Sequence, residues 1–126
     1  MIERVATLAI TLVTLALSVQ PAAAQAGIDP RRIASCQLAA ENMRQRVRPE
    51  TDAYARYDAE VVYWSAQVER FVPDADDRAS LLSEGRTMLN QSAQQQGYMA
   101  GMVMVAQVLE QCNANRSVIE GATPNG

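Results

Sequence analysis

In the middle of the chain, residues 71–77 read Phe-Val-Pro-Asp-Ala-Asp-Asp. Proline lacks the amide hydrogen that a helix interior requires and restrains the residue before it, so Pro73 is expected to end one helix. Asp74 follows as a natural N-terminal cap for the next helix. A calcium loop of the EF-hand type does not fit this acidic cluster, because its glycine and glutamate positions hold Ala79 and Gly85. The stretch therefore predicts a turn between two helices.

Residue 74 lies midway between the two cysteines of the chain, Cys36 and Cys112. A catalytic thiol needs a histidine or a cationic neighbour to lower its pKa, and the chain contains no histidine. Two cysteines without such partners are most simply paired with each other. We therefore predict a disulfide between them, which would close a long loop and stabilise the fold by about 4–5 kcal/mol in the chain-entropy model.

The first 26 residues have the pattern of a secretory signal peptide. A charged start ending at Arg4 precedes the uncharged stretch 5–19, and alanines that fit signal-peptidase cleavage stand at positions 24 and 26. The uncharged stretch is too short for a membrane span, which needs about twenty apolar residues. We expect a bacterial protein that is periplasmic or secreted, without a membrane span after cleavage, in a compartment where a disulfide persists.

Apolar residues recur every three or four positions in both halves of the remaining chain, which is the spacing of an amphipathic helix. In the first half this series begins with Ile33, Cys36 and Ala40. Asp29 and Pro30 stand just before it and are typical of a helix start, since aspartate caps and proline suits the first helical position. The pattern predicts an all-α fold.

Two interruptions leave alternatives open. Pro49 permits either a kink within one continuous helix or a full stop before a second helix. Gly97, together with the polar residues before it, permits either a turn or a continuous helix with a polar middle. Gly97 and Gly101 are four residues apart, a spacing that permits close approach of two helices.

The predicted disulfide limits the topology. Helices joined by short loops alternate in direction, so the cysteines meet only if an even number of helices connects them. One solution is a small antiparallel bundle of four segments, up-down-up-down, with bends near residues 48–52 and 92–97. The other is a two-helix hairpin about 57 Å long at 1.5 Å per residue, which would dimerise. We favour four segments over residues 27–116, followed by a disordered tail at residues 117–126.

The composition excludes several classes of function. The formal net charge is −3 and all eleven basic residues are arginine, so no basic stripe for nucleic acid is expected. Without histidine, the chain lacks the usual general base and the commonest metal ligand. It contains no CxxC motif, phosphate-binding loop or dinucleotide-binding fingerprint. We therefore expect no catalytic site, no cofactor, no metal centre and no nucleic-acid partner.

A surplus of apolar residues indicates an interface. Residues 98–105 are apolar almost all round a helix, and such a helix is normally central in its bundle or lies in an oligomer interface. Their methionines favour packing or a flexible binding surface over a copper(I) site. Tyr63 and Trp64 are adjacent and cannot share a helix face, so one of them is expected at the surface. The candidate interface residues are Tyr63, Trp64, Tyr98, Met99 and Met102.

A matched hairpin would also bring polar side chains together. Residues equidistant from residue 74 would face each other, which places Tyr54 opposite Gln94 and Tyr57 opposite Gln91. The tyrosine hydroxyls would then bond the glutamine amides. We predict a polar waist formed by these four residues, with solvent exposure of all of them as the alternative.

These features indicate an exported helical module that binds another protein, as an inhibitor, an adaptor or an immunity-type factor does, or that pairs with itself as a homodimer. Two alternatives remain open at this point. One is a chaperone-like factor of the envelope stress response. The other is a carrier that holds a small ligand or a metal in the bundle core.

Overall fold

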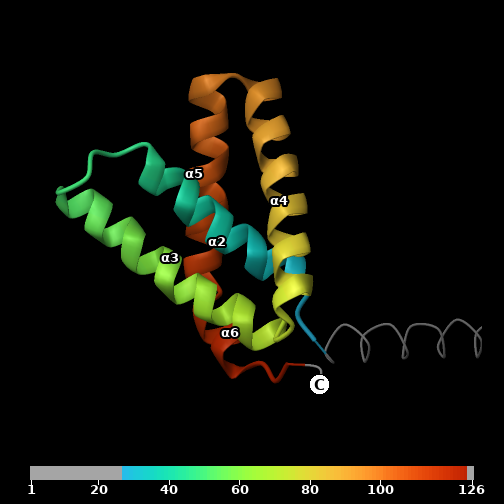
Figure 1. Ribbon diagram of the computed structural model, residues 1–126. Coiled ribbons are helices and arrows are strands. Elements are labelled where there is room, and N and C mark those ends of the chain that lie inside the picture. Colours follow the sequence, from blue (N-terminus) through green and yellow to red (C-terminus); the bar gives the residue numbers. More distant parts are fainter. Residues whose placement is uncertain (1–26, 125–126) are drawn as a thin grey trace, which may run out of the picture. The chain divides into compact units, whose positions relative to one another are not determined.

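The helices of the chain begin and end near the capping and turn residues that the sequence predicts. The computed structural model describes residues 27–124, and over this range the chain forms helices and no strands (Figure 1). The all-α prediction is therefore confirmed, whereas the predicted signal peptide, residues 1–26, lies outside the described residues. The helices are α2 (Pro30–Gln45), α3 (Asp52–Phe71), α4 (Ala75–Gln96), α5 (Tyr98–Ala114) and α6 (Arg116–Gly121).

Aspartate caps fix two helix starts, as the sequence predicts. Asp29 Oδ1 accepts a 3.0 Å hydrogen bond from the backbone N–H of Arg31 at the start of α2, which has Pro30 in its first turn. Asp74 Oδ1 accepts a 2.9 Å bond from the N–H of Asp77 at the start of α4. These bonds satisfy backbone donors that have no partner within the helix. Local chemistry therefore determines where α2 and α4 begin.

Both open interruptions are full stops. After α2, Glu50 adopts a positive φ of 69°. Thr51 then caps α3, because its Oγ1 accepts a 3.1 Å hydrogen bond from the N–H of Tyr54. Between α4 and α5, Gly97 has a φ of 87°, a conformation that glycine adopts readily. The four long helices therefore form two antiparallel hairpins, α2–α3 and α4–α5.

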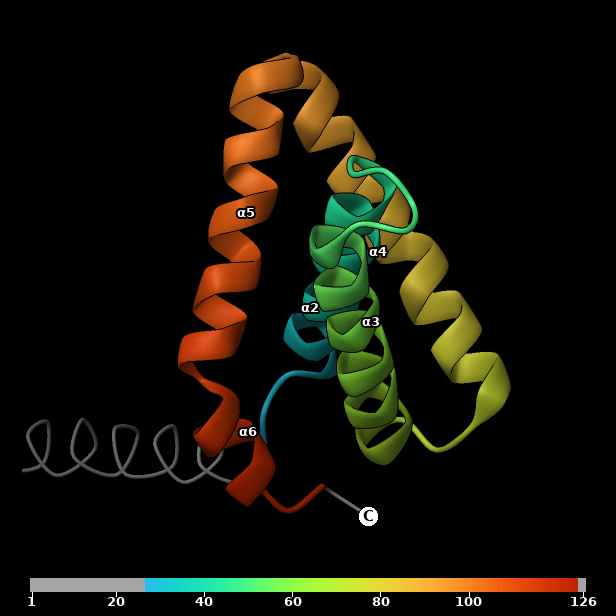
Figure 2. The ribbon, with the colours of Figure 1, turned by 90° about the vertical axis from the view of Figure 1, so that its left-hand side faces the viewer.

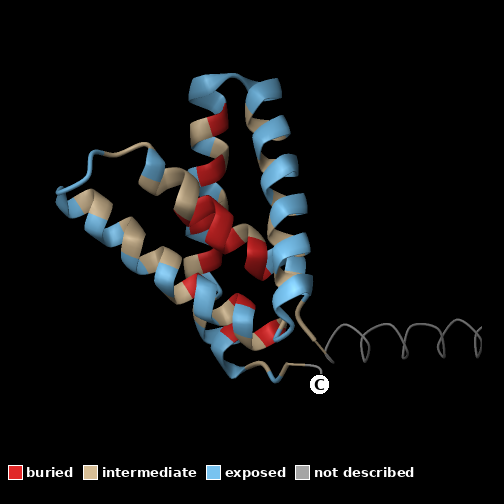
Figure 3. Cartoon of the chain, in the orientation of Figure 1, coloured by how far each residue is buried: buried red, intermediate tan, exposed pale blue. Residues whose placement is uncertain are grey.

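The core is built around α2. Residues 33–40 are all buried except Ser35. Trp64 of α3 and Val105 of α5 are fully buried beside them, and Figure 3 shows the buried residues gathered where these helices meet. Residues 98–105 were expected either at the centre of the bundle or in an oligomer interface. The structure places α2 at the centre instead. The small residues of α2 allow it to approach neighbours on several sides at once.

The bundle consists of two hairpins that cross. Figure 2 shows the arms α4 and α5 diverging from their turn, with α2 lying between them. α2 packs against α3, α4 and α5, whereas α3 and α4 contact each other little beyond their junction. The second hairpin thus holds α2 of the first hairpin between its arms.

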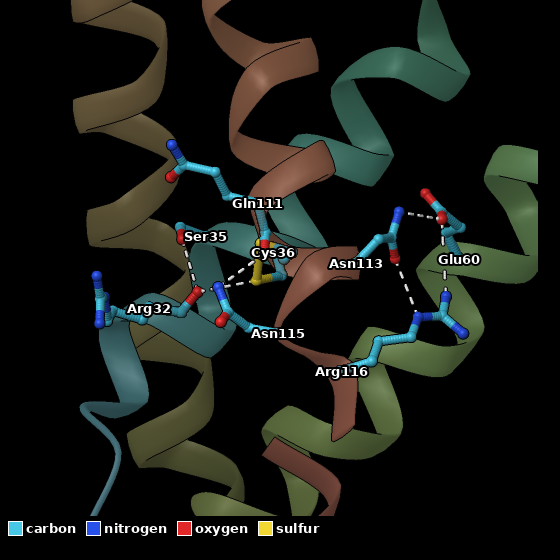
Figure 4. Close-up of a disulfide and its surroundings, with 9 residues drawn as sticks. Arg32, Ser35, Cys36, Glu60, Gln111, Asn113, Asn115 and Arg116 are labelled. Atoms are coloured by element: carbon cyan, nitrogen blue, oxygen red, sulfur yellow. Dashed lines mark hydrogen bonds and ion pairs between the residues drawn. A yellow bond between two sulfur atoms is a disulfide. The ribbon is translucent and has the colours of Figure 1, made fainter. Parts of the chain in front are cut away.

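The disulfide joins the central helix to the last long one. Cys36 lies in the first half of α2 and Cys112 near the end of α5, and their Cα atoms are 5.8 Å apart (Figure 4). Only 3% and 7% of the two residues are exposed. The predicted pairing is confirmed. The four helices from α2 to α5 satisfy the requirement for an even number.

The prediction of a disordered tail over residues 117–126 is wrong for the part that forms helix α6. Ile119 of α6 is 6% exposed. Arg70 of α3 donates hydrogen bonds of 2.6 Å to the carbonyl of Ile119 and 2.8 Å to that of Ala122. The guanidinium thereby gives the Ala122 carbonyl a donor and adds a second donor to the Ile119 carbonyl, which also accepts from the backbone N–H of Ala122. The local composition of residues 117–126 does not show that one apolar residue is buried or that a distant helix caps this segment. The sequence alone therefore predicted disorder.

The arms of the second hairpin touch near their turn. A Cβ added to Gly101 would lie 2.9 Å from the carbonyl oxygen of Ala93 and 3.1 Å from its Cα. These are main-chain atoms, which cannot move aside as the end of a flexible side chain can. The expected close approach is therefore confirmed at Gly101.

We expect Gly101→Ala to lower the free energy of unfolding by about 1–3 kcal/mol, because the added methyl group would push α5 away from α4. Gly121→Ala is the matched control, since a Cβ there meets no atom within 4 Å; it should change stability by less than about 0.5 kcal/mol. Urea unfolding followed by circular dichroism measures both. Equal stability of the two variants would contradict the close packing of the arms.

Candidate functional site

A groove opens where α4 departs from the core. α4 contributes no buried residue, and its inner face lies opposite α2 and α5 across a space of about 350 Å³. The groove is open to solvent along one side, and most of its walls are apolar. The apolar side chains that line it include Leu38, Leu81, Met88, Leu89, Met104 and Val108.

The spacing of residues along α4 builds one wall of this groove. Leu81, Gly85, Met88 and Ser92 are four, three and four residues apart, so they occupy one face of the helix. A Cβ at Gly85 would lie 2.7 Å from Leu38 Cδ1. The missing side chain therefore lets Leu38 of α2 pack directly against α4, and both residues form part of the groove wall.

Charged groups stand at the border of the groove. Arg31 of α2 and Glu84 of α4 both line it, and both are exposed. The three salt bridges found among the described residues use other side chains. Neither charge has an ion-pair partner within residues 27–124, so both are available to a bound molecule.

Two methionines make the groove adaptable in shape. Met88 is 65% exposed at its edge, and Met104 Sδ accepts a 3.3 Å hydrogen bond from Gln96 Nε2. Thioether side chains are flexible and polarisable, so they fit apolar groups of different shapes. The groove is thus suited to apolar groups.

Residues 27–124 hold no group of three or more His, Cys, Asp or Glu able to bind a metal, and none of their helices could cross a bilayer.

The structure contradicts the choice of Trp64 as an interface residue, because Trp64 is fully buried. Tyr63 is half-buried and packs edge-on against it, with ring centroids 4.8 Å apart. The guanidinium of Arg116 lies 3.9 Å from the centroid of the Tyr63 ring, and the Tyr63 hydroxyl donates a hydrogen bond to Glu120. Tyr63 therefore anchors α6, the segment that was expected to be disordered.

The other three candidate interface residues lie at the start of α5. Tyr98 is 72% exposed and Met99 66% exposed, whereas Met102 is half-buried. The guanidinium of Arg46 lies 5.2 Å from the centroid of the Tyr98 ring. None of these three residues lines the groove. They belong to a separate surface at the turn end of the α4–α5 hairpin.

The predicted polar waist does not form. Figure 1 shows α3 and α4 diverging from their junction, so the start of α3 and the end of α4 lie far apart. Tyr54 and Tyr57 are half-buried on α3, while Gln91 and Gln94 are exposed on α4. The matched hairpin fails because α3 packs on α2 rather than along α4.

Polar contacts fasten α6 and the end of α5 to α3, as Figure 4 shows. Glu60 Oε1 accepts a 2.6 Å hydrogen bond from Asn113 Nδ2 and lies 3.6 Å from the guanidinium of Arg116. Arg116 Nε in turn donates a 2.9 Å bond to Asn113 Oδ1. Each of these three side chains thus contacts the other two, next to the disulfide.

Partial burial raises the pKa of Tyr63 to about 12. The hydrogen bond to Glu120 acts in the same direction, because loss of the phenol proton would place two negative charges side by side; Arg116 and Arg70 oppose it. An unfolded tyrosine has a pKa of about 10. The contribution of this contact to stability is therefore complete below pH 10 and is lost as the pH rises through about 12.

No protein-family model matches this chain, and searches of the curated proteins and of the solved structures returned no match. The groove is therefore identified from geometry alone. The sequence shows the apolar series Leu81, Gly85 and Met88 as one helix face, but it does not show what lies opposite. The signal that could have revealed a groove is the scarcity of large apolar residues on the rest of α4.

We expect a spectrophotometric titration of the phenols to contain one step centred at about pH 12, since Tyr63 ionises late. Tyr63→Phe should remove that step. Glu120→Gln should move it to lower pH, because the neutral amide still accepts the hydrogen bond without repelling the phenolate. A late step that persists in Tyr63→Phe would contradict the contact with α6.

Proposed function

We propose that this chain is an exported helical module that binds another protein in the groove between α2, α4 and α5, as an inhibitor, adaptor or immunity-type factor. The observation that carries the proposal is the groove itself, an apolar space of about 350 Å³ formed by three helices and bordered by two charges without ion-pair partners among the described residues. A closed core would leave no such space.

The partner that fits best is an amphipathic helix. The groove extends along α4 from Leu81 to Ser92, about 16 Å at 1.5 Å per residue, or three helical turns. A helix laid into such a groove inserts apolar side chains at positions i, i+4 and i+7. A basic residue of the partner would meet Glu84, and an acidic one would meet Arg31. This pair of charges sets the direction of the bound helix.

Export is supported by the signal-peptide pattern of residues 1–26 and by the buried disulfide. Disulfides persist in the periplasm and outside the cell and are rare in the cytosol of mesophiles. A periplasmic or secreted location gives the Cys36–Cys112 bond the oxidising surroundings that it needs. A rigid, bonded scaffold in turn holds the groove open at little cost in ordering when the partner binds.

The binding mode is tested with a displayed library of helical peptides, selected on the oxidised protein. We expect enriched peptides to share an apolar i, i+4, i+7 face. Met88→Glu should weaken their binding at least about tenfold, which corresponds to about 1.4 kcal/mol. Val62→Glu is the matched control, because Val62 on α3 is also 65% exposed and lies outside the groove.

The charges provide a second readout of the same experiment. Exchange of the two border residues, Arg31→Glu together with Glu84→Arg, should reverse the order of charges in the enriched peptides. Peptides that bind Met88→Glu and the parent protein equally well would contradict the groove as the binding site. Selection of peptides without an apolar face would contradict the helical partner.

A second candidate function is favoured by the size of the groove. A volume of about 350 Å³ lies within the range of pockets that hold small ligands, which begins at about 300 Å³. In this case the protein would carry a small apolar molecule. Native mass spectrometry of gently purified protein would then show a bound mass that Met88→Glu loses, whereas a bare chain alone would argue against the carrier.

A further inference from the structure

The α4–α5 hairpin contains a long stretch without charge. Between Arg86 and Glu110, residues 87–109 include no Asp, Glu, Lys or Arg, although charged residues make up 20% of the whole chain. This stretch forms the turn and the upper parts of both arms. Figure 1 shows this end of the hairpin extending beyond the end of α2. One end of the fold thus presents a protruding surface of neutral side chains.

The protruding end is ordered as well as exposed. Residues 94–100 are all exposed, yet the contact between Gly101 and Ala93 packs the arms together directly below them. On the outer side of α5, Met99 is 66% exposed and Val103 is 51% exposed. These two residues are four positions apart and share a helix face, and Ala106 continues this face. The result is an unpartnered apolar strip on a firmly held helix.

We propose that this strip of α5, formed by Met99, Val103 and Ala106, binds the same strip of a second copy of the chain across a twofold axis. In a twofold dimer each surface meets itself, so a charged residue near the axis would face its own charge. A neutral surface avoids this repulsion without needing a complementary charge. Antiparallel packing of two α5 helices near Val103 would join the two hairpins through one helix of each.

The polar residues of the tip fit the same partner. Gln94 and Gln95 are exposed at the end of α4. A glutamine amide carries both a donor and an acceptor and no net charge, so it repels neither a donor nor an acceptor of the second copy. The polar residues of the tip therefore add no like-charge repulsion to the contact.

The same glutamines disfavour a bilayer as the partner. Insertion of the tip into hydrocarbon would remove water from amides at its leading end, and unpaired amides are costly there. A charged protein partner would also find no charge within residues 87–109 to fix its orientation. The neutral strip therefore fits a second copy better than a charged partner.

This contact goes beyond the proposed groove function and does not depend on it. Met99, Val103 and Ala106 do not line the groove, and Arg31 and Glu84 do not belong to the strip. A contact through one helix face buries less than the standard area of about 800 Å² per partner, so we expect a weak dimer. We expect a dissociation constant of about 10–100 µM for this dimer.

Light scattering coupled to size exclusion, at concentrations up to about 500 µM, tests the proposal on the oxidised protein. We expect the parent protein to shift from monomer to dimer over this range. Val103→Glu should weaken association at least about a hundredfold, because two glutamates would face each other near the axis. Val62→Glu, an exposed valine on α3, is the matched control and should still dimerise.

Cross-linking gives an independent readout that does not rely on a disruptive variant. Val103→Cys should form an intermolecular disulfide under mild oxidation, and Val62→Cys should not do so over the same time. A parent protein that stays monomeric up to about 500 µM would overturn the proposal. The proposal would also be overturned if Val103→Glu and Val62→Glu weakened association equally. Co-sedimentation of the monomer with neutral lipid vesicles that Val103→Glu abolishes would overturn it as well.

Discussion

The Cys36–Cys112 bond is the constraint on which the arrangement of helices depends. It fastens the first half of α2, the most buried helix, to the end of α5. Since the bonded residues stand symmetrically about the turn at Asp74, the chain between them must go out and return in helices of alternating direction. The bond also closes a loop of 76 residues in the unfolded chain, which limits the conformations that compete with the fold.

With the disulfide in place, the position of α2 determines how α4 and α5 are arranged and where the groove lies. Residues 33–40 of α2 include three alanines, and all of them except Ser35 are buried between neighbours rather than along one stripe. The arms α4 and α5 meet at Gly101 and then diverge around α2, as Figure 2 shows. Because α2 is slender, it fills the space between the arms only in part. The groove is the space that remains, and Leu38 packed against Gly85 forms part of its wall.

The sequence predicts the parts of this fold that local chemistry controls. The caps at Asp29 and Asp74, the break at Pro73 and the pairing of the cysteines are all found as expected. The sequence predicts poorly those features that depend on the angles at which the helices cross. Trp64 was named among the candidate interface residues and is fully buried, and the segment that forms α6 was taken for a disordered tail.

The groove and the failed polar waist have the same origin. Both depend on how α3 and α4 diverge after their junction, and a helical repeat along one helix carries no information about the direction of the next. Met88 could be assigned to a face of α4 from spacing alone. Its neighbour across the groove, Met104 of α5, could not be assigned without the structure.

Unfolding of the protein with and without the Cys36–Cys112 bond shows how far the fold depends on it. The free energy of unfolding in urea is measured for the oxidised protein, for the same protein after reduction, and for the double variant Cys36→Ala, Cys112→Ala. We expect both forms without the bond to lose about 4–5 kcal/mol in free energy of unfolding. Equal stability of all three, with two free thiols in denatured and unreduced protein, would contradict this expectation.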